Sequence, residues 1–451
     1  MPEQTRSLAL FNDEPTLKDK IGRSDLVAKV GTAVAACQPP QVVGVHGEWG
    51  CGKTSFLHQL QLYLTGECPQ QPFDDPQCKA LAEEMWKDWC AKDDVVVVWF
   101  EAWRYQHDDT PVVALLQEIR AQLAWKTKLF NKGRKIGEVA IQGALFSLED
   151  LTKKIGIQAS KVQEVGEKWE QTHLAYTLPS HVVRQHLEHA IGQLIGKTDK
   201  NKKRLVVLVD DLDRCEAETA YKLLEGIKIY LNLPSCIFVL GMNQQIIEGA
   251  IKQHLPKGKH TDGLAQAYME KLCQNIWHLP VLSKPESLLC ELLKKTHIPE
   301  ATRELACQIV GGSQCLPRNS RKITRFANTL MLFLDHASDP QPNELQMKIL
   351  VVMANLYLFH HKMYRMLEVD PGFYMSIKQW AMGAENEHQL FKNLALTHKY
   401  LAGSSSQGIK PVPTFVDVYA DPTDENVFRV QQLICDLDEG PASEIEKYII
   451  R

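Results

Sequence analysis

The segment Gly47–Thr54 constrains the fold of this chain more than any other part of its sequence. It reads Gly-Glu-Trp-Gly-Cys-Gly-Lys-Thr and matches the pattern Gly-x-x-x-x-Gly-Lys-Ser/Thr. An apolar run over 41–45 precedes it, and a helical pattern that begins at Ser55 follows it. A strand, a glycine-rich loop and a helix in this order form a phosphate-binding loop, because backbone N–H groups and the helix N-terminus converge on phosphate oxygens. The sequence therefore predicts a nucleotide site at the end of a strand.

Every residue of this loop is a candidate for nucleotide binding. Lys53 can reach the β- and γ-phosphates, and the Thr54 hydroxyl can ligate Mg²⁺. The backbone N–H groups of the loop supply further donors to phosphate oxygens. The predicted nucleotide-binding residues of the loop are Gly47, Glu48, Trp49, Gly50, Cys51, Gly52, Lys53, Thr54 and Ser55.

Length and composition narrow the class of protein. A chain of 451 residues is long enough for two or three domains. A formal net charge of −4 argues against a protein that coats nucleic acid. No apolar window reaches the roughly 18 residues that span a bilayer, so we expect no membrane segment and interpret Ile349–Phe359 as a core helix. The 12 cysteines include no Cys-x-x-Cys pair and the polar N-terminus is no signal peptide, which predicts free thiols in the cytoplasm.

Apolar runs alternate with helical patterns over the first 280 residues. The runs over 94–100, 204–209 and 237–241 are typical of buried strands. This alternation predicts an α/β fold of three layers, with a parallel sheet and right-handed crossovers. The expected domains are a lead-in and helix over 1–40, a P-loop core over 41–280 with a helical insertion at about 105–200, a helical lid or sensor domain over 281–400, and a C-terminal extension over 401–451. The first helix is expected to begin near Ser24, an N-cap candidate.

A second half of the nucleotide site follows the third apolar run. The run ends in Asp210 and Asp211, and Asp213 lies two residues further on. A carboxylate at the end of a buried strand can hold Mg²⁺, which is the role expected of Asp210. A second acid can orient and deprotonate the attacking water. Asp211 and Asp213 both qualify for that catalytic role, and their spacing does not choose between them.

Further polar residues could complete this site. Asn243 follows the fourth apolar run, where it could contact the γ-phosphate or simply form a turn. Arg318, Arg321 and Arg325 recur at helical spacing and so share a face. Arg321 is the candidate that would reach the phosphates from a lid domain, and a solvated basic face is the alternative.

Three other patterns have plainer interpretations. The basic run over 197–204 leaves a nucleic-acid contact open, although lysines in a loop before a buried strand are usually solubilising. Trp49 and Trp103 are expected to be packing residues near the site rather than stacking platforms for bases. The helical spacing of His181, His186 and His189 favours exposed helix residues over a metal site.

Taken together, these segments resemble the KAP family of P-loop NTPases, a branch of the STAND-like ASCE ATPases. The resemblance covers about residues 10–335 in six ordered blocks. The matching blocks are Asn12–Pro15 with Ile21–Arg23, Gly47–Phe56, Phe100–Tyr105, Asp210–Cys215, Tyr268–Lys271 with Leu279–Pro280, and Asn319–Phe326.

The resemblance implies an ATPase that uses ATP and Mg²⁺ and acts as a slow, oligomerising molecular switch. A neighbouring subunit would then supply an arginine, with Arg214 or Arg104 as candidates. A role in bacterial antiphage defence and an unidentified protein partner or trigger also follow from the family alone. The residue roles that it implies are phosphate and Mg²⁺ for Lys53 and Thr54, Mg²⁺ for Asp210, water activation for Asp211, accessory roles for Asp213 and Arg214, the adenine end for Arg23, and the helical-subdomain arginine for Arg321.

The chain departs from the family at three places. Many members carry membrane helices between the two nucleotide motifs, whereas the insertion at about 105–200 is charged here. Ser320 replaces the usual proline before the arginine of the helical subdomain. Asn243 stands where an aspartate is common.

Two other functions remain open at this stage. The first is a nucleotide-dependent assembly scaffold with little hydrolysis. The second is a phosphotransferase on an unidentified acceptor, although no arginine pair beside the phosphate loop indicates an acceptor site. ATP is expected rather than GTP, because the segment 201–204 lacks the aspartate of a guanine-reading Asn-Lys-x-Asp motif.

Overall fold

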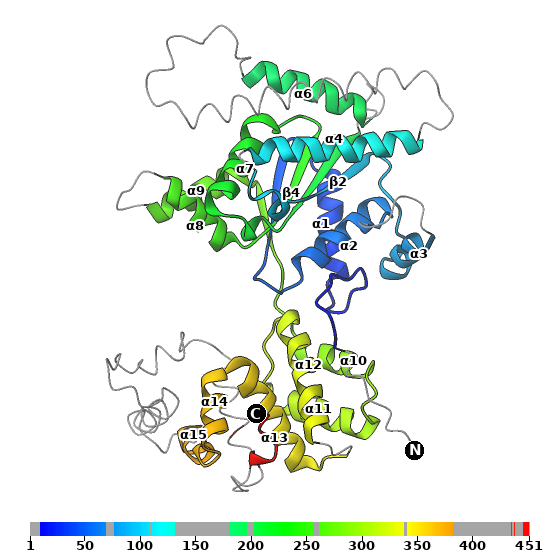
Figure 1. Ribbon diagram of the computed structural model, residues 1–451. Coiled ribbons are helices and arrows are strands. Elements are labelled where there is room, and N and C mark those ends of the chain that lie inside the picture. The colour runs from blue at the N-terminus through cyan, green and yellow to red at the C-terminus, as the bar shows by residue number, and fades with distance from the viewer. Residues whose placement is uncertain are drawn as a thin grey trace. The chain divides into compact units, whose positions relative to one another are not determined.

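The computed structural model describes residues 10–68, 76–108, 110–130, 180–195, 203–255, 261–337, 341–381, 434, 437 and 445–450. They belong to two compact units (Figure 1). The first unit, called the sheet unit here, contains Pro15–Pro280, and the second, the helical unit, combines Val281 onward with the N-terminal segment up to Glu14. Predictions for 131–179, for the basic run before Lys203 and for most of the C-terminal extension lie outside the described residues.

Five parallel strands form the sheet in the described part of the sheet unit, in the order β2-β3-β4-β1-β5. Strand β4 lies between β1, which leads into the phosphate loop, and β3, which carries the acids. Because all strands are parallel, the residues that follow them meet at one edge of the sheet. The strands are β1 Gln41–His46, β2 Val95–Glu101, β3 Arg204–Asp210, β4 Cys236–Met242 and β5 Asn275–His278.

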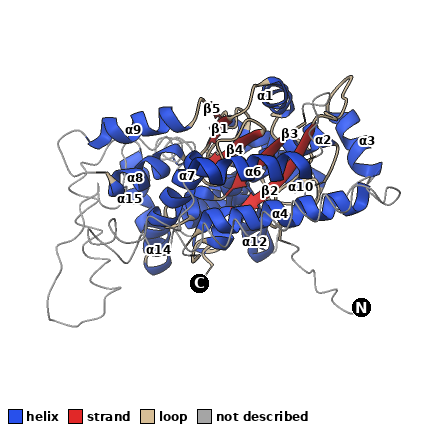
Figure 2. Ribbon diagram, turned by 90° about the horizontal axis from the view of Figure 1, so that it is seen from above, coloured by secondary structure: helices blue, strands red, loops and turns tan. Residues whose placement is uncertain are grey.

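Helices cover both faces of this sheet, as Figure 2 shows for α1 and α4 on opposite sides of the strands. Side chains alternate between two cores along each strand: Val206 packs with α1 and α2, and Val207 packs with α4 and α7. The predicted three-layer α/β fold is confirmed. The first face carries α1 Ser24–Ala36, α2 Lys53–Thr65 and α3 Pro76–Met85. The second carries α4 Pro111–Phe130, α6 Ser180–Leu194, α7 Ala217–Tyr230, α8 Gln244–His254 and α9 Thr261–Leu272.

Two local details differ from the sequence predictions. Strand β5 has no counterpart in them, because both its ends are exposed and its four residues carry no periodic signal. Ser24 is the first residue of α1 rather than its N-cap. The Ser24 N–H instead donates to Asp19 Oδ2 at 2.6 Å, so an upstream carboxylate satisfies this helix end.

The helical unit consists of helices and connecting segments in its described part. Its N-terminal segment lies on α12, since the Phe11 N–H donates to Asn328 Oδ1 at 2.8 Å and the Asn328 side-chain amide donates back to the Phe11 carbonyl at 2.9 Å. The helices are α10 Pro285–Leu293, α11 Glu300–Ser313, α12 Ser320–Ala337, α13 Glu344–Phe359, α14 His361–Val369 and α15 Phe373–Ala381.

Helix α13 contains the apolar segment Ile349–Phe359. A capping box formed by Asn343 and Gln346 begins this helix, and its residues 349–356 are all buried in the unit. The interpretation of this segment as a core helix is therefore confirmed. Across the described ranges, the structure contains no helix that is both long enough and apolar enough to cross a bilayer.

The prediction of free thiols is wrong for four cysteines. Cys68 is disulfide-bonded to Cys78, and Cys290 to Cys307. The Cα atoms of the two pairs are 6.0 and 5.9 Å apart, a separation that suits a disulfide. Sequence spacing could not reveal either pair, because tertiary packing brings their Cα atoms together.

Candidate functional site

The phosphate loop has a backbone that requires its glycines. Gly50 and Gly52 have φ angles of 78° and 93°, in the left-handed region that side chains disfavour. A Cβ atom on Gly47 would lie 2.4 Å from Cys51 Sγ. Helix α2 begins at Lys53 directly after Gly52, so its N-terminal N–H groups face the loop. The local sequence thus forms the backbone cradle that phosphate binding needs.

The Lys53 side chain is buried within this loop, with 7% of it exposed. Its ammonium group donates to the carbonyl oxygens of Gly47 at 2.8 Å and Glu48 at 3.2 Å. A third contact joins it to Asp213 Oδ2 at 3.1 Å. The side chain predicted to bind phosphate therefore lies in the loop, paired with an acid from beyond β3.

Asp213 connects the two halves of the site. It lies in a short 3₁₀ helix, η2 (Leu212–Arg214), and is buried. Besides Lys53, its Oδ2 accepts hydrogen bonds from Trp49 Nε1 and from the Asn243 N–H, both at 3.0 Å. Asp213 therefore holds the phosphate loop, η2 and the end of β4 together.

Asp210 ends β3 with only 2% of its surface exposed. Burial raises the pKa of its carboxyl to about 6, the neighbouring Asp211 adds to the rise, and a hydrogen bond with the Thr54 hydroxyl opposes it. Among the described residues, Asp210 Oδ1 has no hydrogen-bond partner. A buried carboxylate oxygen without a donor, beside a hydroxyl, fits a Mg²⁺ site made by Asp210 and Thr54.

Asp211 follows with a left-handed backbone, at φ 54° and ψ 29°. Its Oδ1 pairs with Arg214 Nε at 2.8 Å. Burial raises the pKa of Asp211, Arg214 opposes that shift, and Asp213 and Glu101 add to it. Glu101 is a member of this acidic group that the sequence predictions missed. A sequence signal was available, since Glu101 follows the apolar run over 94–100 as Asp210 follows its own run. The structure pairs the two residues in register.

Arg23 stabilises the phosphate loop through hydrogen bonds to backbone carbonyls. Its two terminal nitrogens donate to the carbonyl oxygens of Cys51 and Pro280, both at 2.6 Å. Arg23 is buried, and burial lowers the pKa of its guanidinium. Ser55, at the start of α2, accepts a hydrogen bond from the Thr16 N–H at 3.1 Å. Both residues therefore attach the lead-in segment to the phosphate loop.

The remaining polar candidates of the sheet unit have partners within it. The Asn243 side chain accepts from the Gln245 N–H as the N-cap of α8, which is the turn-forming alternative. Arg104 Nε pairs with Glu101 at 2.6 Å. His46, which the sequence analysis did not select, accepts from the Gln244 N–H at 2.9 Å and so joins the ends of β1 and β4.

Arg321 belongs to the helical unit, where it is ion-paired with Asp13. Arg318 precedes α12, so only Arg321 and Arg325 lie on that helix. The prediction that all three arginines share one helical face is therefore wrong. Across the described ranges no group of three His, Cys, Asp or Glu residues could hold a metal, and the side chains of His181 and His186 lie outside them.

Trp49 and Trp103 are not packing residues, contrary to the prediction. Trp49 is 56% exposed and Trp103 is 44% exposed. Trp49 keeps this exposure while its indole N–H contacts Asp213. Trp103 lies in the 3₁₀ helix η1 (Ala102–Tyr105), which follows β2 at the same edge of the sheet. Sequence alone could not distinguish these exposed rings from buried ones.

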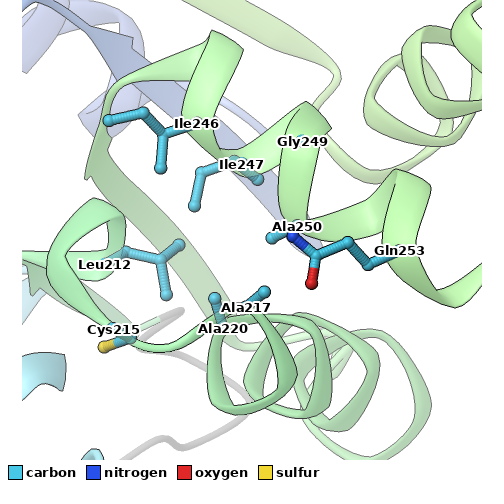
Figure 3. A pocket seen from close by; sticks show the side chains of 9 residues that line it. All are labelled: Leu212, Cys215, Ala217, Ala220, Ile246, Ile247, Gly249, Ala250 and Gln253. Atoms are coloured by element: carbon cyan, nitrogen blue, oxygen red, sulfur yellow. The ribbon is translucent and has the colours of Figure 1, made fainter. Parts of the chain in front are cut away.

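An apolar cavity of about 170 Å³ lies between η2, α7 and α8. Figure 3 shows Leu212, Ala220 and Ile247 lining it, with Cys215 at its edge. Burial raises the pKa of Cys215 to about 12, and Asp211 and Asp213 add to the shift, so this thiol stays neutral. Because no residue of Gly47–Thr54 contributes to its walls, the cavity is distinct from the phosphate site.

Comparison with known proteins agrees with a phosphate-binding site where β1 and β3 end. The sequence model of the KAP family P-loop domain matches residues 23–336, a range that contains both the phosphate loop and the acids after β3. An uncharacterized protein of Methanocaldococcus jannaschii is 24% identical over 173 residues, which cover 32% of this chain and 87% of the relative. The family match spans more than half of the chain and carries the assignment.

Proposed function

Because the chain belongs to the KAP family of P-loop NTPases, we propose that it binds ATP with Mg²⁺ and hydrolyses it where β1 and β3 end. The observation that carries this proposal is the convergence of Lys53, Thr54 and Asp210 at one edge of the sheet. Their basic, hydroxyl and carboxylate groups suit phosphate and Mg²⁺ together. When bound, Mg²⁺ neutralises charge that develops on the phosphate oxygens.

Asp211 is the residue best suited to activate water in this scheme. Its pKa is raised by burial, which makes the carboxylate a stronger base than an exposed one. Asp213 Oδ2 already contacts Lys53, Trp49 and Asn243, so it is less available to a water molecule. Arg214, which pairs with Asp211, orients that carboxylate. Catalysis would otherwise depend on positioning by the loop N–H groups and on charge neutralisation by Lys53.

The wider role is proposed from the family. Hydrolysis would be slow and coupled to oligomerisation, with an arginine from a neighbouring subunit. Arg104 suits that role, since its side chain is 71% exposed. Arg321 is proposed to respond to the phosphates. A cytoplasmic location and a function in antiphage defence are part of the same proposal.

The test is phosphate release from MgATP by wild type and by Lys53→Ala, Asp210→Asn and Asp211→Asn, with Lys29→Ala as a control for loss of an exposed lysine. We expect turnover in wild type and the control, and its loss in the three site variants. Size-exclusion profiles with and without ATP test the assembly step. Nucleotide binding without phosphate release would favour the scaffold, and turnover that requires an added acceptor would favour the phosphotransferase.

A further inference from the structure

The contacts of Lys53 carry a further inference, which rests on the proposed function. We propose that Asp213 competes with the β- and γ-phosphates of the nucleotide for Lys53, and that Trp49 reports the exchange. Asp213 would then set nucleotide affinity, and Asp211 would serve the reaction itself.

The first step concerns the hydrogen-bonding capacity of the ammonium group. A lysine ammonium has three N–H donors and no acceptor. In the structure it has three partners: the carbonyl oxygens of Gly47 and Glu48 and the carboxylate of Asp213. Its donors are therefore matched by the protein. A phosphate oxygen can bind Lys53 at full strength only if one of these contacts ends.

The second step identifies the contact that ends. The two carbonyl oxygens belong to the loop backbone, which is held by hydrogen bonds from the Gly47 N–H to the Met242 carbonyl and from Arg23 to the Cys51 carbonyl. Asp213 lies on η2, a separate segment, and its negative charge repels phosphate. With 7% and 1% of the Lys53 and Asp213 side chains exposed, little solvent screens this repulsion. The carboxylate is therefore the partner that phosphate displaces.

The third step links this exchange to Trp49. The indole N–H donates to the same Asp213 oxygen that contacts Lys53. Trp49 is itself part of the phosphate loop, so phosphate binding and the movement of Asp213 act on one ring. The Asn243 N–H also binds this oxygen, and Asn243 caps α8. Displacement of Asp213 thus changes the indole environment and reaches the start of α8.

The substitution Asp213→Asn tests the competition, because it keeps the shape and an acceptor oxygen and removes the charge. Isothermal titration calorimetry with ADP, AMP and the full chain gives the affinities. Measurements in EDTA separate the lysine contact from any metal contact. We expect ADP to bind the variant about tenfold more tightly than wild type, equivalent to about 1.4 kcal/mol, and AMP to bind equally. Asp94→Asn removes a half-exposed acid at the other end of the sheet and should leave ADP affinity unchanged.

The outcomes separate the two proposals. ADP binding to Asp213→Asn that equals or falls below wild type overturns the competition while leaving the nucleotide site intact. No ADP binding by wild type overturns the proposed function and this inference with it. Trp49→Phe should abolish the ADP-induced change in tryptophan fluorescence, and Trp103→Phe should retain it. An undiminished change in Trp49→Phe overturns the reporting role.

Discussion

Replacement of Asp210 by asparagine should stabilise the protein while removing the proposed Mg²⁺-dependent hydrolysis. Asp210 is 2% exposed, and its carboxylate must ionise without water around it. The structure raises the pKa of this carboxyl from 3.8 to about 6. A group with a raised carboxyl pKa favours the folded state at low pH, and that contribution is lost as pH rises through the folded pKa. At neutral pH the ionised Asp210 therefore destabilises the fold.

The size of the effect follows from the pKa values. The difference between 3.8 and about 6 corresponds to about 3 kcal/mol at pH 7. The destabilisation is about 1 kcal/mol at pH 4.5, because the folded carboxyl is then mostly protonated. Asparagine carries no charge and can still accept the Thr54 hydrogen bond. Its side-chain N–H₂ has no acceptor at Oδ1, which costs about 1 kcal/mol, so the net gain at pH 7 is about 2 kcal/mol.

Thermal unfolding from pH 4.5 to 8, without nucleotide or Mg²⁺, measures this gain. A gain of about 2 kcal/mol should raise the Tm of the sheet unit by about 4–8 °C at pH 7. The rise should shrink toward pH 4.5 and be constant above pH 7. Glu83→Gln, which neutralises an exposed acid on α3, should leave Tm unchanged at every pH. A variant that is less stable than wild type at pH 7, or a difference that ignores pH, would refute the reasoning.

Three further predictions concern the frame of the site. Gly52→Ala should lower the free energy of unfolding by about 1–2 kcal/mol through backbone strain alone, because the added Cβ meets nothing within 3.5 Å. Gly263→Ala in α9 should raise the free energy of unfolding by about 0.5–1 kcal/mol, and denaturant titration compares the two variants. Burial lowers the pKa of His58 to about 4, so the free energy of unfolding should fall by up to about 3 kcal/mol as pH drops from 6.5 to 4. In urea titrations His58→Phe should reduce this dependence of stability on pH, and an unchanged dependence would contradict the prediction. Arg23→Met should destabilise the protein by about 2–4 kcal/mol and weaken ADP binding, because the Cys51 and Pro280 carbonyls lose the hydrogen bonds that the buried Arg23 guanidinium donates. Calorimetry that finds equal affinity would show that Arg23 does not support the loop.

The sequence predicted the parts of the fold that depend on local patterns. Buried parallel strands are continuous apolar runs, so β1 to β4 were visible in it. Strand β5 was not, because an exposed edge strand of four residues has no such pattern. The phosphate loop was equally clear, since its glycine positions follow from backbone geometry. Elements whose identity depends on local chemistry were therefore predictable.

Tertiary distances account for what the sequence left open. In the sequence, Asp211 and Asp213 are two aspartates that follow the same predicted strand, and nothing local distinguishes their roles. Only the fold brings one to Arg214 and the other to Lys53. The exposure of Trp49 also depends on the position of η2, because the indole N–H donates to Asp213 in that segment. Residue roles that depend on which side chains meet across the sheet edge require the three-dimensional structure.

Burial is the main reason why Asp210 has the most strongly raised carboxyl pKa that the structure resolves, and the charges at that edge of the sheet contribute to it. Glu101, Asp211 and Asp213 pair with Arg104, Arg214 and Lys53, respectively. Among the described residues, Asp210 has no such basic partner within 4.0 Å, and Asp211 lies next to it in sequence. A cation at Asp210 would complete the charge balance, whereas a phosphate at Lys53 would release Asp213 and increase the local negative charge. Nucleotide binding and Mg²⁺ binding should therefore favour each other through these four carboxylates, even before any contact between metal and phosphate is counted.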